Sequence, residues 1–394
     1  MFKTVNLKNL KSIFISIIFI YFFFSLFVFQ KTMFLGIKKG FTFCFNLLIP
    51  SLFLFMVFSN FILNLNIKTP NLLNKVTNVL FKMPGDCSFA IFMGLLGGYP
   101  AGAVSVKTLL DNKKINQKQA EKLIFFLVGA GPAFVINVVG VSFFGSKFLG
   151  LLIFLSQFLA SLILGVLISR LYLKKESTFL EEKNKSVEKS KKDLLKIFIE
   201  SVNGASKNLF YMCAFVIFFS AILSILQKIL ESSIVSNFFN LMNINKENIK
   251  SITALFFEVT NGCSLGVENH LPIYFLIFAI SWAGVSVHLQ IFYILKDLNF
   301  SKSKFIFFRV VHSIISTALF YLFLLFVKDS AQTIIRKSPC QVLPSSFNFI
   351  PSSIFFIITC ICFILEITEK IQKNSNFSEC KSYKSRKTKK ANTN

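Results

Sequence analysis

The sequence is poor in charged residues and dominated by apolar ones. Asp, Glu, Lys and Arg make up only 15% of its 394 residues, whereas hydrophobic residues make up 54%. Long apolar runs recur along the whole chain, which is not the pattern of a soluble core. The composition therefore indicates an all-α, multi-pass membrane protein whose length is mostly used by one membrane domain.

Common enzyme motifs are missing as well. The sequence has no GxxxxGK[ST], HExxH or GxSxG pattern, and no apolar run carries two neighbouring carboxylates. These absences argue against a P-loop NTPase and against a hydrolase. We expect no catalysis and no bound metal or cofactor, and we keep a membrane enzyme with sparse motifs as a third-ranked alternative.

The eight cysteines contain no CxxC pair. Cys360 and Cys362 lie two residues apart in an apolar run, where a helix would point them in different directions. We interpret the cysteines as small hydrophobic residues rather than as metal ligands.

The net charge of +25 is concentrated in clusters beside the apolar runs. Lysines at such positions fix the orientation of membrane helices and contact anionic lipid headgroups. Residues 370–394 contain eight basic residues and one Glu, which predicts a basic cytoplasmic tail. The charge pattern favours the lipid bilayer over nucleic acid as the partner.

Two apolar stretches, 94–132 and 258–290, are interrupted by glycine and proline. A backbone that leaves helical geometry in lipid exposes polar groups, so such interruptions survive only where protein or a water-filled cavity surrounds them. We predict that the two stretches face each other at mid-membrane, with a ligand or ion pathway between them. The expected backbone breaks are Gly97, Gly98, Pro100, Gly102, Gly129, Gly131, Pro132, Gly262, Gly266 and Gly284.

Apolar runs and charges together predict about eight spans. Residues 12–29 form an uncleaved signal anchor, and Pro50 kinks the next span. Segments 87–110 and 251–267 are predicted to be re-entrant or broken-helix hairpins, because the second is too short to cross and a full span at the first would reverse the lysine asymmetry. The expected segments are the signal-anchor helix 1–33, a first half 34–173, a charged cytoplasmic linker 174–196, a second half 197–327, an external loop and last membrane helix 328–367, and the basic tail 368–394.

Polar connections complete this topology. Residues 64–84, 111–122 and 296–304 are predicted to be cytoplasmic loops, and 227–250 an external one. Asn116 is a candidate N-cap for the helix that follows it.

In this predicted topology the chain enters the first hairpin from the cytoplasm and the second from outside. An inverted repeat would give this opposite orientation of the two hairpins. Gly98 and Gly102 align with Gly262 and Gly266 at one offset, whereas Leu109, Leu110 and Asn116 align with Ile294, Leu295 and Ser301 at another. The offsets disagree, so the repeat is a hypothesis at this point.

Polar residues near the second set of breaks are candidates for lining the pathway. A carboxylate at mid-membrane costs roughly 2.5–3.5 kcal/mol on insertion scales, so Glu258 needs a partner or a protonation role unless it is solvated at an aqueous face. The candidates are Glu258, Thr260, Asn261, Ser286, His288 and Gln290.

Each candidate also has a structural interpretation. Thr260 and Asn261 could serve turn chemistry, and His288 could be a satisfied structural histidine. His288 and Gln290 are two residues apart and share one face only if the helix is unwound there. The glycines either permit close helix packing or free backbone groups for a ligand.

These motifs, taken in order, resemble the sporulation integral membrane proteins of the YlbJ type, members of the wider nucleoside-recognition or Gate-domain group. The resemblance covers residues 34–327 through LIPSLFLFMVFSN, MGLLGGYPAGA, GAGPAFVINVVGVSFFG, EVTNG, AGVSVHLQ and FFRVVHSIIST. It implies two Gate-like halves, a bacterial cell membrane derived from the mother cell, and a role in forming the spore cortex.

The chain departs from that family at two places where the family tends to have polar residues. Gly97 precedes the first GYP, and Val128–Gly129–Ala130 precede GP. The resemblance therefore does not extend to a nucleoside ligand.

Two functions remain open. The chain either transports or senses a small polar solute during spore formation, or it is a non-transporting scaffold that holds other sporulation membrane proteins.

Overall fold

The computed structural model describes residues 27–65, 71–171, 194–242 and 245–327, together with residues 16, 20, 23 and 24. The described part has helices and no strands, which confirms the all-α prediction. The predicted last membrane helix and basic tail lie outside the described residues, as do residues 174–193 of the charged linker and most of the signal-anchor helix 1–33.

The first half begins with one long helix and ends with another. Its elements are α2 (Gln30–Phe43), the π-helix η1 (Cys44–Leu48), α3 (Ile49–Asn64), α4 (Asn71–Phe81), η2 (Gly85–Cys87), α5 (Ser88–Gly97), α6 (Tyr99–Asp111), α7 (Gln117–Leu127), the π-helix η3 (Ala133–Phe143) and α8 (Lys147–Leu171). The π geometry of η1 stands directly before Pro50, where proline disturbs the helical hydrogen-bond ladder.

The second half repeats this order of element types. Its elements are α9 (Leu194–Leu230), α10 (Ser233–Leu241), α11 (Lys246–Phe257), α12 (Val259–Glu268), α13 (Ile273–Trp282), α14 (Gly284–Ile294) and α15 (Lys302–Phe326). In both halves a long helix is followed by a short one, a pair of short helices, an interrupted helix and a final long helix. The inverted repeat itself stays a prediction.

Five of the described helices are long and apolar enough to cross a membrane, fewer than the eight spans expected for the whole chain. They are Gln30–Asn64, Lys147–Leu171, Leu194–Leu230, Ile273–Ile294 and Lys302–Phe326. The interrupted helix α7–η3 does not count as a span by this measure, because the non-helical residues 128–131 divide it and leave Ala133–Phe143 as a shorter apolar helix.

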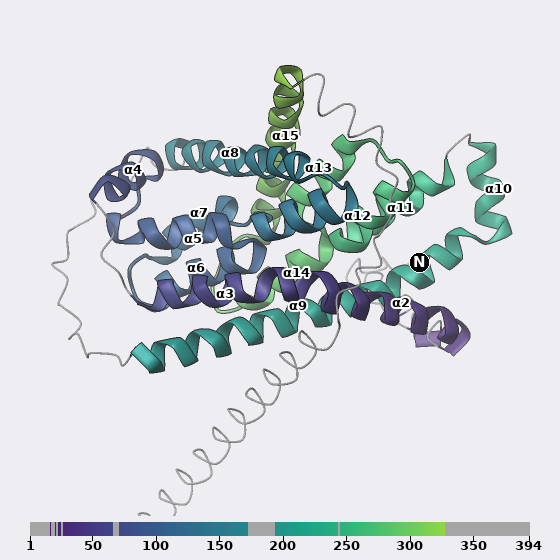
Figure 1. Cartoon of the computed structure of the whole chain (residues 1–394), viewed down its shortest axis with the longest axis horizontal. Helices are drawn as coiled ribbons and strands as arrows, with labels where there is room; N and C mark the ends of the chain where they lie inside the picture. The colour runs from purple at the N-terminus through teal and green to yellow at the C-terminus, as the bar shows by residue number, and fades with distance from the viewer. Residues whose placement is uncertain are drawn as a thin grey trace, which may run out of the picture.

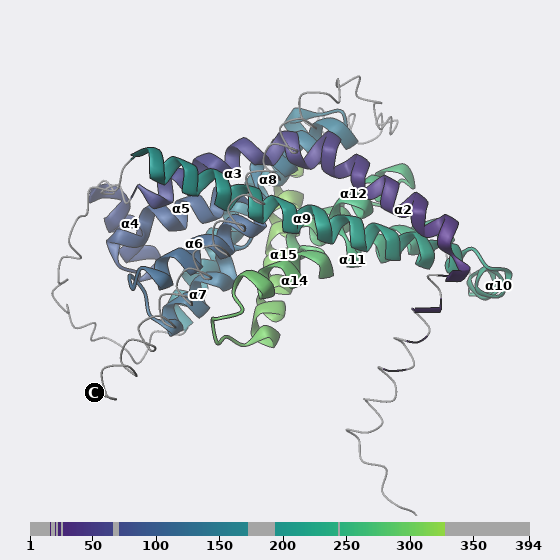
Figure 2. The ribbon, with the colours of Figure 1, turned by 90° about the horizontal axis from the view of Figure 1, so that it is seen from below.

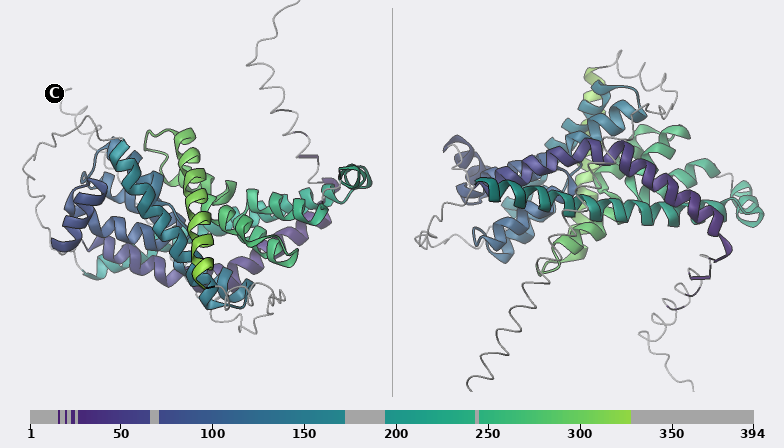
Figure 3. Two further views of the ribbon diagram at one scale, coloured as in Figure 1. Left: turned by 90° about the horizontal axis from the view of Figure 1, so that it is seen from above. Right: turned by 60° about the horizontal axis from the view of Figure 1, so that its bottom comes forward.

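The long helix that begins each half, α2–η1–α3 in the first and α9 in the second, packs against the other along one face of the molecule (Figures 1 and 2). Gly36 and Gly40 make this possible: a Cβ added at Gly36 would lie 2.5 Å from Ser224 Oγ, and one at Gly40 would lie 2.8 Å from Ile217 Cα. Small residues let membrane helices approach this closely. Behind these helices, α15 stands across the others, and the views of Figure 3 show α10 projecting at one end.

Two predicted loops are helical instead. Residues 64–84 contain α4, and 227–250 contain α10 and the start of α11. Their polar composition predicts loops, but α4 has polar and apolar faces, and its Thr77 and Phe81 are buried. Short amphipathic helices of this kind have too few apolar residues to stand out in a sequence of long apolar runs.

Candidate functional site

The first hairpin consists of α5 and α6, which fold back on each other at Gly98. This residue has φ +87°, a left-handed conformation that favours glycine. A Cβ added at Gly94 would lie 3.5 Å from Gly102 Cα, so the two arms pack closely through small residues. Pro100 occupies the first turn of α6, where its missing N–H costs no helical hydrogen bond.

The second hairpin consists of α11 and α12, which turn at Glu258. A Cβ added at Gly262 would overlap Leu255 Cα, a backbone atom of the other arm. Ser251 Oγ on one arm donates to the Leu265 carbonyl on the other at 3.3 Å. Both predicted hairpin segments thus fold as paired short helices.

Each hairpin tip contacts the interruption in the helix that follows it. A Cβ on Gly98 would lie 3.2 Å from Gly131 N, and one on Gly284 would lie 3.1 Å from Val259 Cγ2. The chain is extended at Val128 and leaves α13 through Ala283 in the left-handed region. Four interruptions in the helices therefore gather in one region of the molecule.

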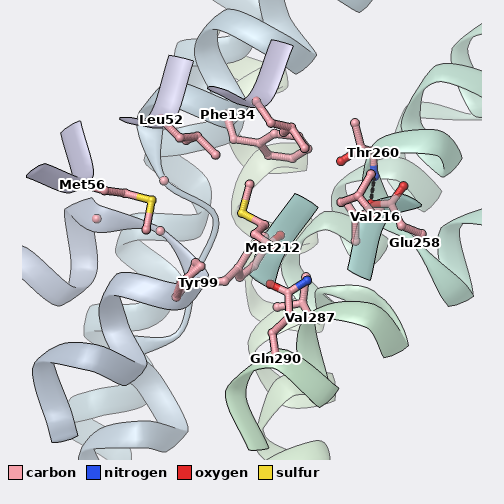
Figure 4. A pocket seen from close by; sticks show the side chains of 16 residues that line it. Leu52, Met56, Tyr99, Phe134, Met212, Val216, Glu258, Thr260, Val287 and Gln290 are labelled. Carbon is pink, nitrogen blue, oxygen red and sulfur yellow. Dashed lines mark hydrogen bonds between the residues drawn. The ribbon is translucent and has the colours of Figure 1, made fainter. Parts of the chain in front are cut away.

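A cavity of about 50 Å³ lies between the two hairpin tips, and we call it the central cavity. Its walls come from η1 and α3, the first hairpin tip, η3, α9, the second hairpin tip and α14 (Figure 4). The polar side chains among its lining residues are those of Tyr99, Glu258, Thr260 and Gln290. The two interrupted stretches of the sequence thus border one internal space.

Glu258 is 2% exposed and serves as the N-cap of α12. One carboxylate oxygen accepts from the Thr260 backbone N–H at 2.9 Å, and the other accepts from the Asn261 backbone N–H at 2.7 Å. These are donors that the first turn of a helix leaves free, and the positive end of the helix dipole lies there too. A protein environment rather than bulk water thus compensates the carboxylate.

Asn261 holds this cap in place. Its Nδ2 donates to Glu258 Oε2 at 2.8 Å and to Ser220 Oγ of α9 at 2.6 Å. The Nδ2 group of Asn261 donates both of its hydrogen bonds in these contacts, and Asn261 is not among the residues that line the cavity. Thr260 does line it, so one of the two neighbours borders the cavity and the other supports the cap.

The residues of α14 are divided in the same way. Gln290 borders the central cavity, and its Nε2 donates to Ser286 Oγ at 3.2 Å, so Ser286 stands behind it. His288 is directed elsewhere: its ring lies 4.9 Å from that of Trp282 and 5.4 Å from that of Phe305. The unwinding that would bring Ser286, His288 and Gln290 to one surface does not occur, because α14 is regular helix from Gly284 to Ile294.

Three of the predicted backbone breaks lie inside helices instead. Gly102 belongs to α6, and Gly262 and Gly266 belong to α12. Their role is close packing: Cβ atoms added there would overlap Leu127 O, Leu255 Cα and Leu276 Cδ2, respectively. The remaining predicted positions stand at or directly beside an interruption: Gly97, Gly98, Pro100, Gly129, Gly131, Pro132 and Gly284.

Two buried side chains that sequence reasoning missed tie the halves together at these breaks. The Tyr99 hydroxyl donates to the Ile280 carbonyl, and Arg309 Nη1 donates to the carbonyl of Val128, the C-cap of α7. Arg309 is 0% exposed, and its Nε and Nη2 have no hydrogen-bond partner among the described residues. His312, one turn later, contacts Ser161 Oγ at 2.9 Å through Nε2.

The fold and this region define a helical, multi-pass membrane protein with two hairpins around a small internal cavity. The chain is similar to the sporulation integral membrane protein YlbJ of Bacillus subtilis (strain 168). The two are 25% identical over 290 residues, which cover 68% of this chain and 71% of that protein. This similarity confirms the resemblance seen in the motifs. No protein-family model matches the chain, and no solved structure matches it.

Proposed function

We propose that this protein transports or senses a small polar solute in the membrane of a sporulating cell, through the central cavity. The observation that carries the proposal is the position of Glu258, a buried carboxylate at a hairpin tip that borders this space. Ionisable residues kept inside membrane proteins mark ion, proton or substrate pathways. Hairpins and interrupted helices at a central site are also the means by which many secondary transporters bind their substrates.

The volume of the central cavity limits the size of the solute that it can hold. A water molecule needs roughly 10–15 Å³ of such space, so about 50 Å³ accommodates a few waters or one small ion. Pockets for drug-sized ligands are roughly 300–1,000 Å³. A nucleoside does not fit in this conformation, which agrees with the loss of polar residues at Gly97 and at Val128–Ala130.

Glu258, Thr260 and Gln290 offer a carboxylate, a hydroxyl and an amide to this solute. The carboxylate is fixed by the first turn of α12, and the amide is steadied by Ser286. Such fixed oxygen groups replace the hydration shell of a polar solute that enters a narrow space. The repeated order of elements suits two inverted, Gate-like halves that rock about this site.

The sporulation context is carried over from the similar protein, whose name places it in sporulation and in the membrane. We further propose, on the family resemblance of the sequence motifs alone, that the chain acts in a mother-cell-derived membrane and in formation of the spore cortex.

The test is a pair of carboxylate substitutions in the organism that carries the gene. Glu258→Gln keeps the size of the side chain and removes its charge, and we expect loss of heat-resistant spores with normal protein level and membrane insertion. Glu268→Gln is the matched control, because Glu268 belongs to the same helix and its partner is Ser264, away from the cavity. Metabolite content of forespore and mother cell, compared with and without the gene, then identifies the solute.

If the Glu258→Gln strain sporulated normally while a strain that lacks the gene did not, the proposed solute pathway would be contradicted. That result would favour the non-transporting scaffold, in which the hairpins serve only to shape the membrane domain.

A further inference from the structure

A second, polar space lies on one side of the central cavity. It measures about 350 Å³ and is lined by the end of α3, by α6, by the first half of α9 and by the end of α14; we call it the vestibule. Its polar lining includes Asn60, Asn64, Lys107, Asp111, Glu200 and Lys207. A space of this size and polarity holds water.

A narrow constriction of about 10 Å³ stands between the vestibule and the central cavity. It shares Asn208, Tyr211, Tyr293 and Ile294 with the vestibule, and it shares Pro100, Met212 and Gln290 with the central cavity. The three spaces therefore form a series. Because 10 Å³ is at the lower limit for one water, the constriction is the closed point between them.

Two tyrosines from opposite walls meet on the vestibule side of this point, where Tyr293 is 43% exposed. The hydroxyl of Tyr293 on α14 donates to that of Tyr211 on α9 at 3.0 Å, and their ring centroids are 4.8 Å apart. Neither hydroxyl has another hydrogen bond among the described contacts. The contact is one that a small rotation of either side chain would open, since it joins two side chains rather than two backbones.

We propose that the Tyr211–Tyr293 pair is the gate between the vestibule and the central cavity. The inference rests on the proposed pathway, which it deepens by naming the residues that control access from one side. With the hydroxyls joined, a polar solute reaches the vestibule and stops. Separation of the rings connects the vestibule to Gln290 and, beyond it, to Glu258 and Thr260.

The test measures access to a thiol introduced in the central cavity. Val216→Cys places this cavity reporter, because Val216 is 3% exposed and lines the central cavity but not the constriction or the vestibule. The full-length chain in sealed membrane vesicles is treated from each side with 2-aminoethyl methanethiosulfonate, while free cysteine on the opposite side scavenges reagent that crosses the bilayer, and the parent chain gives the background from native cysteines. Asn64→Cys is the vestibule reporter, which we expect to react quickly in every variant.

We expect Tyr293→Phe, which removes one hydroxyl and keeps the ring, to raise the reaction rate of the cavity reporter about fivefold from the vestibule side. Tyr211→Ala and Tyr293→Ala should raise it about tenfold or more, because the ring contact is lost too. Tyr321→Ala is the control, since that tyrosine is 51% exposed on α15 and lines none of the three spaces. It should leave the rate unchanged.

The gate proposal would be overturned if the cavity reporter reacted in Tyr293→Phe and in both alanine variants at the same rate as it does without these substitutions, while the vestibule reporter still reacted quickly. The conservative phenylalanine variant keeps the test decisive if an alanine variant fails to accumulate. The reaction rate is independent of sporulation. Faster reaction at the cavity reporter together with normal sporulation of Glu258→Gln would therefore leave the gate standing and remove the transport function.

Discussion

Two buried charged side chains lie at helix ends of opposite polarity. The Glu258 carboxylate accepts N–H groups at the start of α12, and the Arg309 guanidinium donates to the carbonyl that ends α7. The helix dipole places partial positive charge at the first end and partial negative charge at the second. Main-chain groups thus compensate the Glu258 carboxylate and one donor of the Arg309 guanidinium, and a side chain contacts the helix end at each of these two interruptions.

Arg309→Ala should lower the stability of the detergent-solubilised protein by about 2–5 kcal/mol, because it leaves a void and an unpaired carbonyl at Val128. Arg309→Met fills the void and removes two unpartnered donors, so it should lie closer to the parent. Thermal unfolding measures both, with the exposed Arg170→Ala of α8 as control. An Arg309→Ala protein as stable as the parent would show that the residue supports nothing.

Gly102 provides a test of close packing at the first hairpin. A Cβ there would overlap Leu127 O, a backbone atom, whereas a Cβ at Gly129 meets only Ser161 Oγ at 3.7 Å. We expect Gly102→Ala to cost about 1–3 kcal/mol or to prevent folding, and Gly129→Ala to be tolerated. The yield of monodisperse protein compares them, and equal yields would refute the packing role.

At the scale of the element, one helix start, at Asn116, was readable from the sequence, and the helix interruptions were readable only in part. Asn116 caps α7 with a capping box in which its side chain accepts from Gln119 N and Gln119 Oε1 accepts from Asn116 N, each at 2.9 Å. Such a cap is local and follows from residue type and spacing. The breaks at Gly98 and Gly284 were also readable, because both residues have positive φ, which glycine adopts without steric cost.

The sequence predicted breaks at Gly262 and Gly266, whereas the structure places the interruption at Glu258. A break needs a residue that satisfies the free N–H groups of the next helix, and Glu258 does so, whereas Gly262 is needed for contact with the other arm. Placing Gly98 against Glu258 pairs Gly102 with Gly262, four residues from the alignment drawn from sequence alone. Tyr99 and Arg309 were missed because the partner of each is 181 residues away.

The cap at Asn116 makes a prediction at this scale. Asn116→Ala should destabilise the first turn of α7 by about 1 kcal/mol, seen as faster amide hydrogen exchange at residues 117–120. Asn112→Ala, in the same connection and exposed, should leave that exchange unchanged. Uniform exchange in the two variants would mean that packing alone holds the turn.

At the scale of the whole molecule, segments predicted to be cytoplasmic lie together. Lys107 Nζ lies 3.0 Å from Asp297 Oδ2, and Ser301 N donates to Glu121 Oε1 at 3.1 Å, which joins the connections 111–122 and 296–304. Asn64 at the end of α3 contacts Ser201 near the start of α9. Lys107 and Asn64 line the vestibule, so this polar space lies at the end of the protein where the segments predicted to be cytoplasmic meet. Lysine asymmetry and tertiary contacts therefore agree on one end of the protein.

This agreement predicts the sidedness of the membrane domain. Lys207→Cys in the vestibule should react with an impermeant maleimide only from the cytoplasmic side, whereas Asn237→Cys on α10 should react only from outside. Both native side chains are exposed, so burial does not bias the comparison. Reaction of both from the same side would reject the topology.

The π-helices η1 and η3 touch each other and supply Leu48 and Phe134 to the wall of the central cavity. A π turn contains an extra residue relative to an α turn. If the π turn moved along the helix by one residue, the side chains that it passed would rotate about the helix axis by roughly 100°. Most backbone hydrogen bonds of the helix would be kept. The positions of Leu48 and Phe134 in the cavity wall would thereby change while the helices stay hydrogen-bonded in the lipid.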